Sequence, residues 1–395
     1  MGAVARRDDR SPTALAGFLL GASGMFAVIY STQAILPRLS EDFGVSAATS
    51  GLTVSAVVLC LAAGAWVWGP LSDRWGRRRT LICASALVVP PTVMAGLAPS
   101  FGVLIACRAL QGLILPGLLT VGPLYVMEVF GPRLGGRAMG YYLTALVAGG
   151  LLGRVGVALA AAAVGWRAPL VALAALPATS AVVMWRTLPD APVQPAPVRR
   201  RRALLRLLRN RQVLTATGTG AGAFLAFVGV FSYVTFRLEA PPFGWDDTAS
   251  GLIFVLWVMG GLGPVAGQFT DRFGWRTVAL AMMGCVAAGV LLSLPDSLVT
   301  LVPALMLITG GMFCGVTAAQ IGIATASDSD RGTATAIYFS AYYAAGAAGG
   351  YLPGLAWEAW SWPGVVAVAL AGLVPALALL GVHRAPVATA RRAAA

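Results

Sequence analysis

The chain has 395 residues, of which 58% are hydrophobic and 11% are charged, and its mean hydropathy is +0.80. Soluble domains carry about 25% charged residues, so this composition excludes a soluble globular protein and indicates a membrane protein with many spans. The formal charge is +13, and the 28 basic residues are all arginine. Because the sequence has no lysine, it excludes a P-loop ATPase and a Schiff-base enzyme. It has one histidine, which leaves no basis for a histidine triad, a metal site or a cofactor site.

Twelve apolar segments, each long enough to cross a bilayer, follow one another along the chain. The first six cover residues 14–36, 49–71, 80–98, 101–127, 138–163 and 168–186. The second six cover residues 213–236, 249–269, 277–294, 298–322, 333–354 and 364–382. The sequence therefore predicts an all-α, polytopic membrane protein with two six-helix bundles, residues 14–187 and 213–384. A linker, 188–212, joins the bundles, and tails of 1–13 and 385–395 flank them.

The arginines are distributed unevenly across this predicted topology. Twenty-three lie on the side of the two termini, whereas Arg38, Arg167 and Arg237 lie on the opposite side. Arg108 and Arg154 fall inside spans. Because cytoplasmic loops carry the excess of basic residues, we expect both termini in the cytoplasm. The positive charge is then a feature of topology, and its partner is the lipid bilayer and not nucleic acid.

The predicted linker changes in character along its length. Residues 189–197 are rich in proline, residues 199–202 are four arginines, and residues 203–209 alternate leucine pairs with arginines. This pattern is typical of a flexible segment followed by a short amphipathic helix on the inner leaflet. We expect it to connect the two bundles, with a specific lipid or partner site as the alternative.

A weak internal repeat supports two related bundles. Phe43-Gly44 recurs as Phe243-Gly244 at an offset of 200, and the segment 72–78 recurs as 270–276 at an offset of 198. Gly149-Gly150 likewise matches Gly349-Gly350. Corresponding loops in two parallel halves are typical of a duplicated transporter fold.

The segment 69–79, Gly-Pro-Leu-Ser-Asp-Arg-Trp-Gly-Arg-Arg-Arg, lies between the second and third spans. It resembles the loop motif of the major facilitator superfamily, whose fold is a twelve-helix bundle. Gly69 would permit close helix approach, Gly76 an unusual backbone angle, and Asp73 would accept hydrogen bonds from a helix N-terminus. The arginines would pair with acids or lipid phosphates. The resemblance implies a conformational gate formed by Gly69, Asp73, Arg74, Gly76 and Arg77, with Asp271, Arg272 and Gly274 in the second copy.

The fourth span carries Arg108-Ala-Leu-Gln111-Gly112, which is similar to an Arg-x-x-Gln-Gly motif of the same family. The resemblance implies a role for Arg108 in proton transfer or in binding-site electrostatics. A charged residue inside a bilayer is costly unless it is paired or hydrated. The alternative is a structural role, in which the guanidinium donates hydrogen bonds to the backbone carbonyls of a neighbouring helix.

The fifth span contains a second arginine at membrane depth, in Gly149-Gly-Leu-Leu-Gly153-Arg154. Antiporters of the family carry a glycine-rich motif with Gly-Pro in this span, and Gly153-Arg154 replaces that pair here. The departure weakens the antiporter interpretation. Gly149 and Gly153 are expected to allow close helix packing, while Arg154 has no evident structural role.

None of the fifteen acidic residues lies in the core of a predicted span. A neutral or anionic substrate therefore fits the spans better than a cation, with Arg108 or Arg154 as counter-charge.

In this fold, spans 1, 4, 7 and 10 line the cavity, with contributions from spans 2, 5, 8 and 11. The candidates for substrate or proton coupling, each of which could instead be packing, are Tyr30, Gln33, Arg108, Gln111, Arg154, Phe227, Tyr233, Gln320, Tyr338 and Tyr342. Four tryptophans near span ends, Trp166, Trp185, Trp360 and Trp362, are expected to be interfacial anchors.

The resemblance implies a monomeric, multi-pass transporter of a bacterial plasma membrane that works by alternating access and is not an enzyme. We expect proton-coupled efflux of a drug or small metabolite. The alternatives are an uptake permease or uniporter for an organic anion, which the two buried arginines would favour, and a transport-inactive sensor or scaffold.

Overall fold

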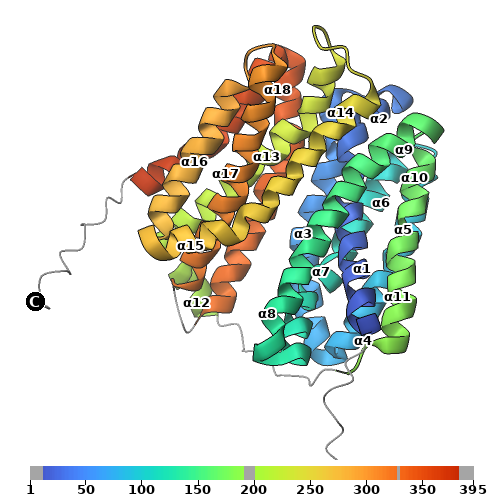
Figure 1. Cartoon of the computed structure of the whole chain (residues 1–395), viewed down its shortest axis with the longest axis vertical. Helices are drawn as coiled ribbons and strands as arrows, with labels where there is room; N and C mark the ends of the chain where they lie inside the picture. The colour runs from blue at the N-terminus through green and yellow to red at the C-terminus, as the bar shows by residue number, and fades with distance from the viewer. Residues whose placement is uncertain (1–11, 191–200, 327–329, 382–395) are drawn as a thin grey trace, which may run out of the picture.

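A computed structural model describes residues 12–190, 201–326 and 330–381, and these residues form helices joined by short turns (Figure 1). The predicted terminal tails and the proline-rich part of the linker lie mostly outside the described residues. The first half contains α1 (Pro12–Tyr30), η1 (Gln33–Ile35), α2 (Leu36–Phe43), α3 (Ala47–Trp75), α4 (Arg77–Leu87), α5 (Val89–Gly96), α6 (Phe101–Ile114), α7 (Pro116–Leu119), α8 (Val121–Leu151), η2 (Leu152–Gly156), α9 (Val157–Val164), α10 (Arg167–Leu173) and α11 (Ala175–Thr187).

The second half follows α12, the short helix of the linker. Its elements are α12 (Arg201–Leu207), α13 (Arg211–Glu239), α14 (Asp247–Leu252), η3 (Ile253–Leu262), α15 (Gly263–Phe273), α16 (Trp275–Leu292), α17 (Leu298–Ala324) and α18 (Arg331–Gly381). Figure 1 shows the two halves side by side, with α13 and α15 to α18 in one and α1 to α11 in the other.

Ten described helices are long and apolar enough to cross a membrane, and the bent pair Thr248–Gly261 and Val265–Phe273 makes an eleventh. As one continuous helix, the 51 residues of α18 would be about 75 Å long at 1.5 Å per residue, far more than the roughly 30 Å core of a bilayer. It is interrupted by non-helical backbone at Trp360 and Ser361. Gly349 and Gly372, on either side of that break, both lie against Leu225 of α13. The two parts of α18 therefore fold back on each other as two spans.

The turns of the two halves correspond in backbone conformation as well as in sequence. Gly44 and Gly244 both have φ of +60°, and Gly76 and Gly274 have φ of +86° and +80°. Positive φ is readily adopted by glycine and costs most other residues steric strain. The repeat predicted from the sequence is thus confirmed at the turns that reverse the chain.

Several spans begin at side chains that cap the helix N-terminus. Ser46 accepts a hydrogen bond from the Thr49 amide at 3.2 Å, and Ser100 accepts one from Val103 at 3.4 Å. In the second half, Asp246 accepts one from the Ala249 amide at 2.8 Å. Because such caps satisfy amides that have no partner inside the helix, these residues set where α3, α6 and α14 begin.

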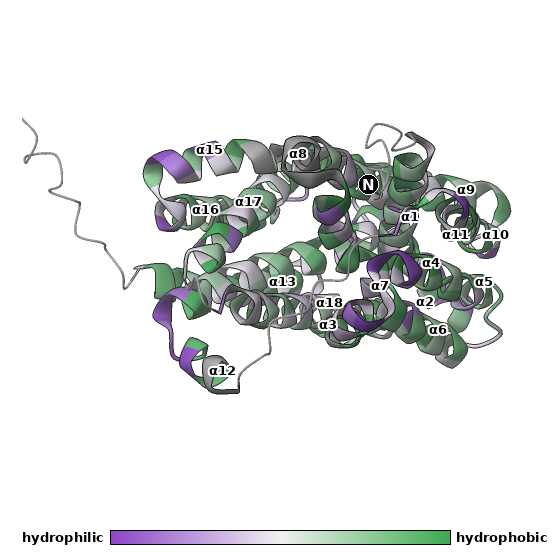
Figure 2. Cartoon of the chain, turned by 90° about the horizontal axis from the view of Figure 1, so that it is seen from below, coloured by the Kyte–Doolittle hydropathy of each residue, from purple (hydrophilic) through white to green (hydrophobic). Residues whose placement is uncertain are grey.

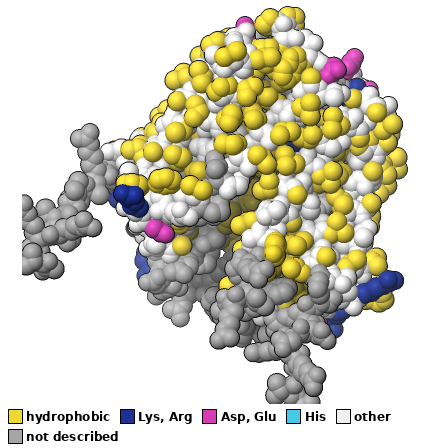
Figure 3. All heavy atoms as spheres, viewed as in Figure 1, with side chains coloured by type: hydrophobic (Ala, Val, Ile, Leu, Met, Phe, Trp, Pro, Cys, Tyr) yellow, Lys and Arg dark blue, Asp and Glu magenta, His cyan; other side chains and the backbone are white. Residues whose placement is uncertain are grey.

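The sides of the bundle are apolar, as expected for contact with lipid. Figure 2 shows mostly green, hydrophobic ribbon along the outer helices, and in Figure 3 the visible charged side chains gather toward the two ends. Trp185 and Trp360 are exposed and fit the predicted interfacial anchors, whereas Trp166 and Trp362 are buried. The prediction is wrong for this second pair because each indole N–H donates inside the protein, to Asp42 at 2.6 Å and to Ser293 O at 3.0 Å.

The helix α12 packs against the second half. Leu207 is buried beside Val213 and Tyr338, and Arg206 forms an ion pair with Asp330. Leu205 on the same helix is 60% exposed. The helix therefore has one face on the protein and one apolar side chain free for the lipid leaflet.

The chain-reversing turns lie at two opposite ends of the bundle. The inner end carries the turns at Gly76 and Gly274, and the outer end carries those at Gly44 and Gly244. In Figure 1 the inner end lies at the bottom, with α4, α12 and α15, and the outer end at the top, with α2 and α14.

Candidate functional site

The loop motif at the inner end is held by one buried arginine. Arg77 donates to Asp73 at 2.6 Å and to the Ser72 hydroxyl, and it pairs with Glu128 of α8 at 3.4 Å. Arg77 is 6% exposed, so this small network ties the second, third and fourth spans together. The expected pairing of the motif's arginines with acids is confirmed for Arg77, while Arg74 is exposed.

Other expectations for the motif are only partly met. Gly76 has the predicted unusual backbone angle, but a side chain added at Gly69 would meet nothing within 4 Å. The prediction that Gly69 permits close approach is therefore wrong, and the close contact is made one turn earlier, where Gly64 lies against the carbonyl of Leu113. Asp73 bonds within its own motif instead of at another helix N-terminus.

The second copy of the motif keeps the turn but not the network. Gly274 reproduces the backbone angle of Gly76, whereas Asp271 and Arg272 are exposed. Arg272 stacks over Phe273 at 5.2 Å, and among the described residues it forms no salt bridge. The two halves therefore differ in how firmly their inner turns are anchored.

All three guanidinium nitrogens of Arg108, in α6, donate hydrogen bonds to other groups of the protein. Its guanidinium donates to the carbonyls of Val28 at 2.7 Å, Ile29 and Thr53 at 2.9 Å, and to the Gln111 side chain at 2.7 Å. Val28 and Ile29 lie in the last turn of α1, where carbonyls have no partner inside the helix. Arg108 thus caps a break in the first span, and Gln111 supports it. This geometry fits the structural alternative for Arg108.

Arg154 lies in the π-helical segment η2 of the fifth span and is 0% exposed. Its guanidinium carbon is 3.8 Å from the centre of the Tyr30 ring and 3.9 Å from that of Trp257. It donates to Gln33 Oε1 at 2.7 Å and to the carbonyl of Gly150 at 3.1 Å. The cation is therefore stacked between an aromatic ring of its own half and one of the other half, an arrangement that stabilises a desolvated charge.

Glycines bring the Arg154 segment against the first span. A side chain at Gly149 or Gly153 would collide with the backbone carbonyl of Ser23 or Ala27 in α1. The predicted role of these glycines in close packing is confirmed. Because α1 and the fifth span touch along their backbones, Tyr30 and Gln33 come within reach of Arg154.

The contacts of Arg154 continue into the second half. Gln33 Nε2 donates to Ser232 Oγ of α13 at 3.1 Å, so Gln33 links Arg154 to the other bundle. Phe227, one of the predicted residues, packs on Trp257 with ring centres 5.0 Å apart. Four of the sequence candidates, Tyr30, Gln33, Arg154 and Phe227, are thus gathered around Trp257.

The outer end is closed by contacts between α3 and α18. Gly51 lies against the carbonyl of Gly350, and Tyr233, another predicted residue, donates to that carbonyl at 2.7 Å. On α3, Ser55 donates to Ala347 O at 2.6 Å, and the Ala48 amide donates to Glu358 at 2.9 Å. These contacts join the halves over two turns of helix, so Tyr233 is part of the outer seal.

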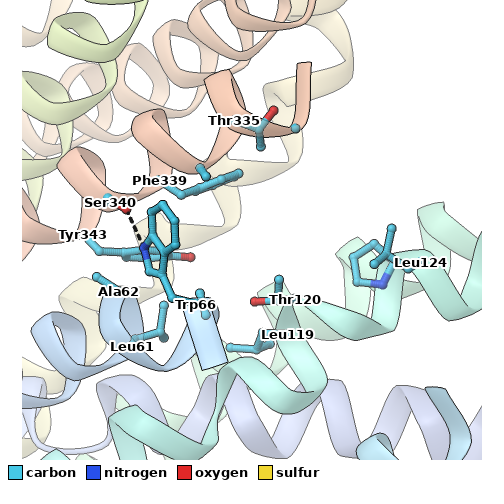
Figure 4. A pocket seen from close by; sticks show the side chains of 14 residues that line it. Leu61, Ala62, Trp66, Leu119, Thr120, Leu124, Thr335, Phe339, Ser340 and Tyr343 are labelled. Atoms are coloured by element: carbon cyan, nitrogen blue, oxygen red, sulfur yellow. Dashed lines mark hydrogen bonds between the residues drawn. The ribbon is translucent and has the colours of Figure 1, made fainter. Parts of the chain in front are cut away.

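A cavity of about 390 Å³ lies between the halves toward the inner end. Its walls come from α3, from α7 and α8, and from the first part of α18, as Figure 4 shows. Trp66 donates to Ser340 at 3.0 Å across the cavity, beside Phe339 and Tyr343. The helices α3 and α18, which touch at the outer end, thus line an opening at the inner end. The hydrogen bond from Trp66 to Ser340 crosses this opening.

Two remaining candidates, Tyr338 and Tyr342, pack on the lining residues Phe339 and Tyr343 without lining the cavity themselves. Tyr338 is buried, and Tyr342 stacks on Phe224 of α13 with ring centres 4.0 Å apart. Gln320 is exposed. Tyr343 packs on Tyr342 at 5.2 Å, so the cavity wall and these buried rings form one aromatic layer.

Several residues that join the two halves were not among the candidates predicted from the sequence, because only the contact between the halves reveals them. Trp66 and Ser55 lie in the predicted second span, Trp257 lies in the eighth, and Glu358 lies between the predicted eleventh and twelfth spans, but nothing in their sequence context sets them apart. The one available signal was an indole at membrane depth, far from the span end where tryptophans usually anchor. Among the described residues, no three His, Cys, Asp or Glu side chains are grouped as metal ligands.

Comparison with known proteins places these features in context. Residues 14–349 match the family model described as Major Facilitator Superfamily. The chain is 30% identical over 357 residues to the inner membrane transport protein YnfM of Escherichia coli (strain K12), covering 89% of this chain and 86% of that protein. It is 26% identical over 373 residues to the uncharacterized MFS-type transporter YybF of Bacillus subtilis (strain 168), covering 92% and 91%. In fold it is similar to the crystal structure of the nucleoside transporter NupG, with a TM-score of 0.78 and 15% identity over 93% of this chain and 99% of that one.

Proposed function

The chain belongs to the major facilitator superfamily, and from that premise we propose that it exports a small organic molecule across the plasma membrane in exchange for protons. A transporter of this family alternates the access of a central site between the two sides. The observation that carries the proposal is the asymmetry of the α3–α18 contact, sealed at Gly51 and Gly350 and open at the cavity beside Trp66. With both termini in the cytoplasm, as the arginine distribution predicts, this is the inward-facing form.

Export agrees with the charge of the site. Arg154 is the buried cation between the halves and forms no salt bridge among the described residues. If the substrate is an anion, a membrane potential negative inside drives it outward by about 2.3 kcal/mol per elementary charge per 100 mV. Uptake of the same anion would need energy from elsewhere.

Proton coupling requires an ionisable group whose hydrogen-bond partners differ between the form that is open at the inner end and the form that is open at the outer end. Glu358 meets this requirement, because its carboxylate accepts the Ala48 amide across the halves when the outer end is closed. The outer half of α3 has no charged side chain. Glu358 is exposed at the outer end, and loss of its charge would weaken a charge-assisted bond to the helix N-terminus and so favour opening of the outer end.

The experiment is a substrate screen in proteoliposomes, run with and without an imposed pH gradient. Accumulation that follows the gradient supports proton-coupled transport. Transport indifferent to the gradient would point to the uniporter, and accumulation in the direction of uptake to the permease. A transport-inactive sensor predicts no counterflow for any compound that binds.

A further inference from the structure

Among the residues that the structure describes, two buried hydrogen-bond donors between the halves have no acceptor. They are Nη2 of Arg154 and Nε1 of Trp257, in side chains that are 0% and 2% exposed. Buried polar groups are nearly always hydrogen-bonded, and leaving one without a partner costs stability. Two such donors on adjacent side chains therefore indicate a missing acceptor that both could share.

The two donors belong to groups that converge on one place. The guanidinium carbon of Arg154 lies 3.9 Å from the centre of the Trp257 ring. A side chain added at Gly150 would lie 3.0 Å from Trp257 Nε1 and 3.3 Å from Arg154 Nη1. Both groups thus border the bare backbone of Gly150, together with the ring of Phe26, whose Cδ1 would lie 3.3 Å from the same added side chain.

The surroundings of these donors are aromatic and lack a counter-ion. Tyr30 covers one face of the guanidinium, and Phe26 and Phe227 pack on Trp257 with ring centres 6.3 and 5.0 Å apart. Arg154 has no carboxylate partner among the described residues. A cationic ligand would be repelled here, and a ligand with one negative charge would balance the arginine.

We propose that the acceptor is the carboxylate of the transported molecule, an organic monoacid with a flat apolar body. One carboxylate oxygen accepts from Arg154 Nη2 and the other from Trp257 Nε1, while the body packs on the surrounding rings. This inference rests on the proposed transport function and names its substrate class. Because Arg154 and Trp257 come from different halves, separation of the halves gives the ligand access to them.

A series of ring contacts connects this place with the inner cavity. Tyr343 in the cavity wall lies 6.2 Å from the ring centre of Phe224, and Phe227 follows one turn later on the same helix. Phe227 in turn contacts Trp257. These rings therefore form a continuous apolar layer between the cavity and Arg154.

The test is binding to the purified full-length protein in detergent, without a gradient. The probes are three acids with flat apolar bodies, benzoate, indole-3-acetate and 2-naphthoate, each compared by isothermal titration with its neutral amide. Wild type should prefer at least one acid over its amide. Trp257→Phe keeps the ring and removes only the N–H, so it should weaken binding of that acid by at least about tenfold, equivalent to about 1.4 kcal/mol, and leave the amide unchanged.

The matched control is Trp362→Phe, since that buried indole already donates to Ser293 O at 3.0 Å. It should not change binding. Arg154→Gln should remove the preference for acids altogether. Equal binding of acid and amide across all three pairs, or an unchanged affinity in Trp257→Phe, would overturn the proposal. Gradient-driven transport would remain open to test in either case, so failure here is distinct from failure of the proposed function.

Discussion

Alternating access can be tested by adding one methyl group at the outer seal, the contact between α3 and α18 at Gly51 and Gly350. Gly51 of α3 lies against the carbonyl of Gly350 in α18, and a Cβ at Gly51 would fall closer to that oxygen than the 3.0 Å that real Cβ contacts respect. Gly51→Ala therefore forces the two helices apart by about 1 Å in a packed interface. The outer-closed form should become less stable, and the outer-open form should gain population.

The magnitude follows from the hydrogen bonds on either side of Gly51. Ser55 donates to Ala347 O at 2.6 Å, and the Ala48 amide donates to Glu358 at 2.9 Å. A stretch of about 1 Å takes both beyond the roughly 3.2 Å limit of a hydrogen bond. Their loss costs about 3 kcal/mol, since one partner is charged. At 1.4 kcal/mol per factor of ten, the equilibrium shifts roughly 100-fold toward the open outer end.

The assay is a distance measurement between spin labels at Glu41→Cys and Val299→Cys, two exposed outer-end positions of different halves, in a cysteine-free background. Gly51→Ala should add or enlarge a long-distance population. Gly102→Ala is the control, because a side chain there would meet nothing within 4 Å. An unchanged distance distribution in Gly51→Ala would refute the assignment of this contact as the outer seal.

Four further substitutions separate structural from functional roles. Arg108→Gln should lower thermal stability by roughly 3 kcal/mol, because buried backbone carbonyls lose their donor, yet leave substrate selectivity intact; altered selectivity in a stably folded variant would contradict the structural role. Asp73→Asn should slow transport without loss of membrane insertion, whereas Asp271→Asn, exposed in the second copy, should have little effect; equal initial rates for Asp73→Asn and wild type would argue against the gate. Glu358→Gln keeps an acceptor for the Ala48 amide but removes its charge, so the label distances at the outer end should gain a longer, outer-open population; an unchanged distance distribution would exclude Glu358 as the coupling group.

Arg108 and Arg154, the two arginines inside predicted spans, show how far the sequence alone predicts the site. Both were identifiable as candidates, because a charge inside an apolar span is costly wherever it occurs. Their roles were not, because the groups that satisfy a guanidinium come from other helices. Arg108 meets backbone carbonyls of α1, and Arg154 meets the rings of Tyr30 and Trp257.

Composition, hydropathy and arginine placement determined that this chain is a membrane protein in two related halves, and the turns at Gly44, Gly76, Gly244 and Gly274 follow from local backbone preferences. These properties depend on short stretches of chain and on the energy of moving side chains between water and lipid. Only the tertiary structure decided that Gly51 meets Gly350 and that Arg154 meets Trp257. Such contacts join residues more than a hundred positions apart, and they depend on how two bundles dock, which no local pattern encodes.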